Sequence, residues 1–213
     1  IEIQPLNYCG YMRLRDSGAD SITLYQETYH LETYSKHHLS GFKKNYANRL
    51  FAVEEAALAE FNVVNIGALL GLYDWRFDVL SLAYHLTYLS RKFWKSHYAV
   101  SFPRITDMVG SFNVPYACTD RDLVQIICAF RMVFSDCGIT LSTRENSSFR
   151  DGVIPLGITT ISAESATSPG GYTLKKDEEQ FATHDKRSIS EIITLLDQVG
   201  LDPMLKNWDS VIT

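Results

Sequence analysis

A strand-like run that ends in ionisable side chains is the strongest chemical feature of the sequence. Residues 21–30 read SITLYQETYH, so an apolar, β-branched stretch gives way to polar groups. A strand of a parallel sheet is buried on both faces, and in a barrel of alternating strands and helices the ligands bind where the strands end. Glu27 stands at this change, where a carboxylate is costly unless it meets a cation or hydrogen-bond donors. We interpret Glu27 as a candidate binding residue; the alternative is a rim glutamate paired with Lys36 or Lys43.

An alternative interpretation of the same segment is a metal site. Glu27-x-x-His30, followed by His37 and His38, supplies donor types that zinc accepts. No second element of matching spacing accompanies them, so we assign no metal ligand and no catalytic residue. The chain has four cysteines, none in a C-x-x-C pair: Cys9, Cys118, Cys128 and Cys137. Their irregular spacing indicates reduced thiols in a cytosol-like compartment.

Charged residues also follow the other apolar runs of the chain: Asp74, Arg104, Arg144 and Glu164. We expect them to meet Glu27 at one rim of a sheet. Two guanidinium groups and several carboxylates suit a zwitterionic ligand, such as an amino acid or a cofactor with an amino-acid moiety, because a guanidinium binds a carboxylate with two hydrogen bonds. The alternative, that each arginine pairs with a neighbouring carboxylate as Arg144 could with Glu145, stays open.

The elements that must position these groups alternate along the chain. Apolar runs predict strands near residues 2, 21, 63, 98, 139 and 158. Helical periodicity predicts helices over residues 48–61 and 76–94, and a further helix capped by Thr119 or Asp120. A capping box, Ser188-x-x-Glu191, opens the final helix. Residues 28–46 are predicted to form a long rim loop.

This alternation predicts an α/β fold with a parallel sheet and right-handed crossovers. Six units with polar strand ends correspond to a partial (β/α) barrel. We expect residues 1–213 to form part of one barrel domain, with residues 173–213 as its C-terminal helix and tail. The first residues lack an initiator Met, and we interpret the chain as a fragment.

Composition excludes two classes of partner. The formal net charge is -5, whereas a nucleic-acid binder needs a basic surface to neutralise phosphates. No run approaches the ~20 apolar residues of a membrane span. We therefore expect no nucleic acid and no membrane among the partners.

Five short motifs occur in order along the chain: LYQETY at 24–29, IGALLGL at 66–72, VSFPR at 100–104, LSTRE at 141–145 and PGGY at 169–172. Together they closely resemble the 2-iminoacetate synthases, the tyrosine lyases of thiamine thiazole biosynthesis, which belong to the radical S-adenosylmethionine superfamily. The resemblance runs over essentially the whole chain.

The resemblance implies a specific reaction. A reduced 4Fe-4S cluster cleaves S-adenosylmethionine into methionine and a 5'-deoxyadenosyl radical. The radical takes a hydrogen from L-tyrosine, and the Cα–Cβ bond breaks to give 2-iminoacetate (dehydroglycine) and p-cresol. The resemblance also implies thiazole synthase as a partner, a flavodoxin-type or other electron donor, and a location in the cytoplasm or the plastid stroma.

Site residues follow from the same resemblance. Glu27 matches the acidic residue that contacts S-adenosylmethionine, and Arg49 matches the arginine at its methionyl carboxylate. Leu69 and Gly71 lie in a variant of the motif beside the adenine. For the tyrosine carboxylate the first choice is Arg144 and the second is Arg104, with Ser101 lining the pocket.

One departure from the family is serious. The C-x-x-x-C-x-x-C loop that binds the cluster is absent, and in the family it lies upstream of the position of Ile1. We expect the 213-residue chain to be inactive by itself and active in a full-length protein. Two alternatives stay open: a non-catalytic barrel remnant that binds a partner, and a tyrosine lyase of the type that matures iron-only hydrogenase.

Overall fold

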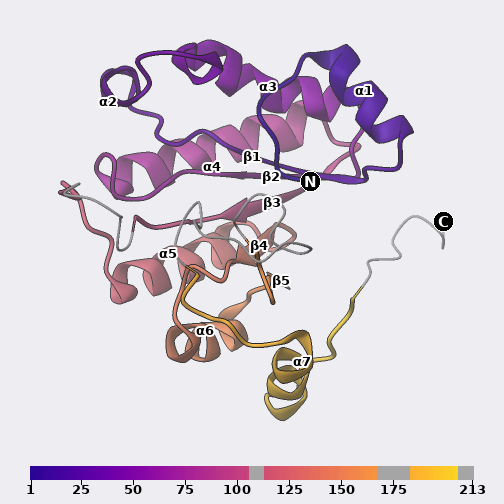
Figure 1. Cartoon of the computed structure of the whole chain (residues 1–213), viewed down its shortest axis with the longest axis vertical. Coiled ribbons are helices and arrows are strands. Elements are labelled where there is room, and N and C mark those ends of the chain that lie inside the picture. Colours follow the sequence, from indigo (N-terminus) through magenta and orange to yellow (C-terminus); the bar gives the residue numbers. More distant parts are fainter. Residues whose placement is uncertain (106–112, 167–182, 206–213) are drawn as a thin grey trace.

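A parallel β-sheet forms the centre of the computed structural model, which describes residues 1–105, 113–166 and 183–205. Five strands pair in the order β1-β2-β3-β4-β5, all parallel (Figure 1). The strands are β1 Ser21–Tyr25, β2 Val63–Gly67, β3 His97–Ser101, β4 Gly138–Leu141 and β5 Thr160–Ile161. Because all five strands are parallel, their carboxyl ends, which carry the predicted site, lie along one edge of the sheet.

Helices connect successive strands and cover the outside of the curved sheet. They are α1 Tyr8–Asp16, α2 Leu31–His37, α3 Tyr46–Leu58, α4 Trp75–Lys92, α5 Asp120–Val133, α6 Ser147–Val153 and α7 Ile189–Gln198, with the 3-10 turns η1 Phe42–Lys44 and η2 Ile154–Leu156. Figure 1 shows α1 and α3 at one end of the sheet and α6 and α7 at the other. The fold is therefore a sector of a (β/α) barrel, as predicted.

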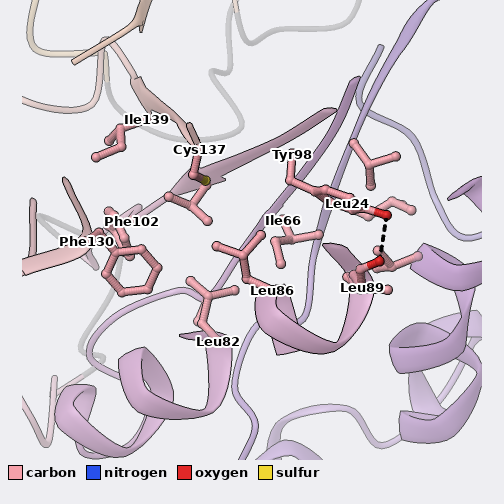
Figure 2. Packing of buried hydrophobic residues seen from close by; sticks show 14 of the residues in the cluster. Leu24, Ile66, Leu82, Leu86, Leu89, Tyr98, Phe102, Phe130, Cys137 and Ile139 are labelled. Carbon is pink, nitrogen blue, oxygen red and sulfur yellow. Dashed lines mark hydrogen bonds between the residues drawn. The ribbon is translucent and has the colours of Figure 1, made fainter. Parts of the chain in front are cut away.

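The apolar core lies between the sheet and the inward faces of the helices. Leu82, Leu86 and Leu89 recur at helical spacing on α4, and each is at most 2% exposed. Figure 2 shows them beside Ile66 of β2, and the Tyr98 hydroxyl donates to the Leu89 carbonyl over 3.2 Å. Burial of a leucine side chain stabilises a fold by about 1.5–3 kcal/mol, so this stripe fixes α4 firmly against the sheet.

Three predicted elements differ from the structure. The strand expected near residue 2 is reduced to a bridge between Glu2 and Thr23, at an edge where pairing comes from one side only. The last strand has two residues. Residues 28–46, predicted to be a loop, contain α2 and η1, because the His30 side chain caps α2 at the Thr33 amide and Tyr34 packs into the interior.

The two predicted helix caps are confirmed. The capping boxes of α5, at Thr119 and Asp122, and of α7, at Ser188 and Glu191, are formed. The PGGY motif and the end of the predicted tail lie outside the described residues. Over the part of the chain that the structure describes, no helix is long and apolar enough to cross a membrane.

Candidate functional site

Glu27 occupies a tight turn at the end of β1. Its φ of 72° lies in the left-handed region, which is unfavourable for a residue with a Cβ. The turn is tied to the end of β2, because the Gln26 amide donates to the Gly67 carbonyl over 2.9 Å and the Leu69 amide donates to the Glu27 carbonyl over 2.7 Å. These bonds hold the Glu27 side chain at the carboxyl edge of the sheet.

Two cations contact the Glu27 carboxylate. Arg49 Nη2 lies 2.9 Å from Oε1 and Lys43 Nζ lies 3.0 Å from the same oxygen. Arg49 Nε also donates to the Tyr25 carbonyl, so the guanidinium bridges the strand and the turn. The pairing of Glu27 with Lys43, which was the alternative interpretation, is present in the structure, and Arg49 is a second partner.

Arg144, which follows β4, belongs to the same electrostatic environment. Desolvation lowers the pKa of Arg144, while Tyr25, Glu2 and Glu27 raise it. Desolvation raises the pKa of Glu2, which Arg144 lowers, Glu27 raises and Arg49 lowers. The predicted residues Glu27, Arg49 and Arg144 thus share one region of mixed charge, which we call the charged mouth.

Arg104 has a different environment. Its Nε and Nη2 donate to the two carboxylate oxygens of Glu145, the Nε–Oε1 distance being 2.9 Å. Its Nη1 donates to the Cys118 carbonyl over 3.0 Å and lies 2.9 Å from Asp120 Oδ1. The side chains of Arg104 and Glu145 are 8% and 5% exposed. Arg104 is thus paired with a carboxylate, but its partner Glu145 lies 41 residues away and is the residue that the sequence suggested as a partner of Arg144.

Ser101 lies in a polar network on the inner side of the strands. Its hydroxyl accepts from Asn65 Nδ2 over 3.0 Å and donates to Asn65 Oδ1 over 3.2 Å. Burial raises the pKa of Tyr25 to about 12, although the side-chain hydrogen bond with Ser101 lowers it. Tyr25 and Ser101 line a cavity that Ser142 and Glu145 also border. The rest of the cavity lining is mainly apolar, with Leu123, Ile127 and Ile139 among its side chains.

Leu69 and Gly71 follow β2 and lie next to the Glu27 turn. The Leu69 amide is the group that binds the Glu27 carbonyl. Gly71 has a φ of 119°, and a Cβ there would lie 2.9 Å from a methyl carbon of Val114. A glycine is required at this position both by the backbone and by the space around it.

Asp78, on the first turns of α4, was not predicted as a site residue. It is 0% exposed, and its Oδ1 accepts from the Tyr29 amide over 2.7 Å and from Thr28 Oγ1 over 2.9 Å. Burial raises its pKa to about 6, against hydrogen bonds from Tyr29 and Thr28 that lower it. The sequence holds a signal for it: Asp78 lies four residues before Leu82, on the inward apolar stripe of α4.

The described residues do not fit an iron–sulfur cluster. No group of three or more His, Cys, Asp or Glu side chains in them could hold a metal ion. His30, considered for a metal site, instead caps α2 and stacks on Tyr73 with the ring centroids 3.7 Å apart. Of the free cysteines, Cys9 is exposed and Cys137 is buried.

Known proteins resemble this chain in sequence and in fold. Residues 101–202 match the family model described as the Biotin and Thiamin Synthesis associated domain. HydG, a maturase of the FeFe-hydrogenase, superposes with a TM-score of 0.85 at 36% identity, over 94% of this chain and 44% of that one. Methylornithine synthase (PylB) has a TM-score of 0.66 at 19% identity, over 96% of this chain and 58% of that one, which shows the fold alone. The described residues therefore form a sector of the same kind of (β/α) barrel as these two proteins.

The sequence comparison is more specific. The chain is 43% identical over 212 residues to 2-iminoacetate synthase of Escherichia coli (strain K12), which covers 99% of this chain and 56% of that protein. The predicted resemblance to 2-iminoacetate synthase is confirmed. The chain spans somewhat more than half the length of this curated relative.

Proposed function

We propose that the full-length protein containing this chain is a tyrosine lyase, which cleaves the Cα–Cβ bond of L-tyrosine to give 2-iminoacetate and p-cresol for thiamine thiazole biosynthesis. The observation that carries the proposal is the 43% identity to 2-iminoacetate synthase over 99% of the chain. The charged mouth supports it, because S-adenosylmethionine and tyrosine each carry an α-carboxylate and an α-ammonium group.

The residues at the end of β1 fit S-adenosylmethionine. Glu27 would bind its ammonium group and Arg49 its carboxylate, and these opposite charges already lie 2.9 Å apart. The backbone at Leu69 and Gly71 would border the adenine. Bound to a reduced cluster, this cofactor supplies the radical that starts the reaction. The described residues offer no site for the cluster, so we place its ligands outside them.

Arg144 would hold the carboxylate of tyrosine. A guanidinium keeps its charge at any working pH and binds a carboxylate through two hydrogen bonds. Because Arg104 neutralises Glu145, Glu145 competes less strongly for the neighbouring Arg144. The pKa of about 12 keeps the Tyr25 hydroxyl protonated, so that it can donate a hydrogen bond on the wall of the cavity. We therefore assign Arg104 a positioning role and keep Ser101 as a lining residue.

The test uses full-length protein, reduced and reconstituted with iron and sulfide. We expect p-cresol from tyrosine, together with glyoxylate formed by hydrolysis of 2-iminoacetate. Arg144→Lys keeps the charge but loses the two-pronged geometry, and we expect it to raise the KM for tyrosine without changing cleavage of S-adenosylmethionine. If S-adenosylmethionine is cleaved and no p-cresol appears, the proposed substrate is wrong.

The likeness to HydG favours a second candidate, a tyrosine lyase of the hydrogenase-maturase type. The identity to 2-iminoacetate synthase is higher, and it favours the thiamine role. Growth without added thiazole of a bacterial strain that lacks its own 2-iminoacetate synthase, when given the full-length gene, separates the two. Under the thiamine role, thiazole synthase and a flavodoxin-type donor are the partners we propose.

A further inference from the structure

A set of hydrogen bonds connects helix α4 to the segments that carry Glu27 and Arg49, the two residues proposed to hold S-adenosylmethionine. We call Asp78, Thr28, Tyr29 and Tyr46, which form these bonds, the bracket. Asp78 Oδ1 accepts from the amide of Tyr29 and the hydroxyl of Thr28, the two residues that directly follow Glu27. The Thr28 hydroxyl in turn accepts from the His30 amide over 3.1 Å. The chain leaving the Glu27 turn is therefore fastened at one carboxylate oxygen.

Tyr29 extends the bracket to helix α3. Its carbonyl accepts from the Tyr46 hydroxyl over 3.0 Å, and its own hydroxyl lies 2.9 Å from His85 Nδ1 on α4. Tyr46 is the first residue of α3, and Arg49 lies one turn further along the same helix. The same short segment thus sets the Glu27 turn on one side and the start of the Arg49 helix on the other.

The bracket and the Glu27 turn include two features that are unfavourable for the stability of the fold. Asp78 is fully buried, and its Oδ2 has no hydrogen-bond partner among the described residues. A buried carboxylate with an unpaired oxygen is unfavourable. Glu27 is held in a left-handed conformation that a residue with a Cβ resists. The charged acceptor gives stronger hydrogen bonds than a neutral one, and these bonds hold the segment that follows Glu27.

We propose that Asp78 is a positioning residue, whose carboxylate, through Thr28 and Tyr29, holds Glu27 and Arg49 in the geometry that binds the amino-acid end of S-adenosylmethionine. The inference rests on the proposed function. It concerns the S-adenosylmethionine half of the charged mouth, because the bracket holds the segment that directly follows Glu27 and the start of the helix that carries Arg49.

The test measures equilibrium binding to the full-length, reconstituted protein without reductant, so that S-adenosylmethionine is not consumed. We expect Asp78→Asn to raise the Kd for S-adenosylmethionine about tenfold and to leave the Kd for L-tyrosine unchanged. The melting temperature should not fall, because the variant removes a buried charge. Thr28→Val removes one of the two donors and should weaken S-adenosylmethionine binding in the same direction, by a smaller factor.

Asp122→Asn is the matched control. Asp122 also accepts from a backbone amide and a hydroxyl, both of Thr119, at the start of α5 and outside the bracket. We expect it to leave both Kd values unchanged. Unaltered S-adenosylmethionine binding in Asp78→Asn, or equal weakening of both ligands with a lower melting temperature, would overturn the positioning role. Wild-type protein that binds no S-adenosylmethionine would overturn the proposed function itself.

Discussion

The ion pair of Arg104 and Glu145 allows a sharp test of whether Arg104 stabilises the fold or binds the substrate. Arg104→Met would leave the Glu145 carboxylate buried without its bidentate partner, since the two side chains are 8% and 5% exposed. Removing one partner of a buried pair costs about 3–5 kcal/mol. The shift is ~2–4 °C per kcal/mol for 150–250 residues and smaller for a longer chain, so we expect the melting temperature of the full-length protein to fall by roughly 5 °C. The measurement is thermal unfolding of the full-length protein, followed by calorimetry.

The double variant Arg104→Met/Glu145→Leu separates structure from substrate binding. Replacing both members of a buried pair by apolar groups of similar size is often nearly neutral, so the melting temperature should return close to the wild-type value. We expect the KM of the double variant for tyrosine to equal that of the wild-type protein. A double variant that is as stable as wild type but has a KM for tyrosine raised tenfold or more would refute this reasoning and restore Arg104 as a substrate-binding residue.

Three further outcomes follow from the structure. Burial raises the pKa of Asp78 in the folded state from 3.8 to about 6, so between these pH values the folded state binds more protons than the unfolded state. As the pH rises through this window, the free energy of unfolding of the wild-type protein should therefore fall relative to that of Asp78→Asn. Urea titrations at several pH values would detect this difference. Gly67→Ala places a Cβ 2.4 Å from the Ser101 carbonyl oxygen and should cost about 1–3 kcal/mol or more, whereas Gly152→Ala, with open space around it, should be neutral or stabilising in the same titration. The 213-residue chain by itself should aggregate, because the edges of its sheet recruit other chains; a sharp, reversible melt of a monomer would contradict this.

Much of the sheet could be predicted because its determinants are local. The change from apolar to polar residues located the end of β1 at Glu27, and helical periodicity located α4 and α5 to within a few residues. Helix α2 was missed because it is short and depends on one buried side chain, Tyr34, and on a cap by His30. The motif at residues 169–172 lies outside the described residues, so its predicted rim position stays a prediction.

The partners of the charged groups could not be predicted, because they are set by contacts between distant segments. Sequence proximity suggested Arg144 as the partner of Glu145, whereas the structure places Arg104, 41 residues away, on both of its oxygens. Asp78 reaches Tyr29 across a separation of 49 residues. A polar residue on an apolar helical stripe, as at Asp78, is the sequence signal that such a contact exists, but it does not identify the partner.

We propose that one charged mouth holds two amino-acid-like molecules, with Arg49 binding S-adenosylmethionine and Arg144 binding tyrosine. The most direct measurement is the Kd of each ligand for the full-length Arg49→Met and Arg144→Met variants. We predict that Arg49→Met weakens S-adenosylmethionine binding alone and that Arg144→Met weakens tyrosine binding alone, each by tenfold or more, as expected for loss of a charged hydrogen-bonded pair. Variants that affect neither ligand, or that exchange these effects, would contradict it.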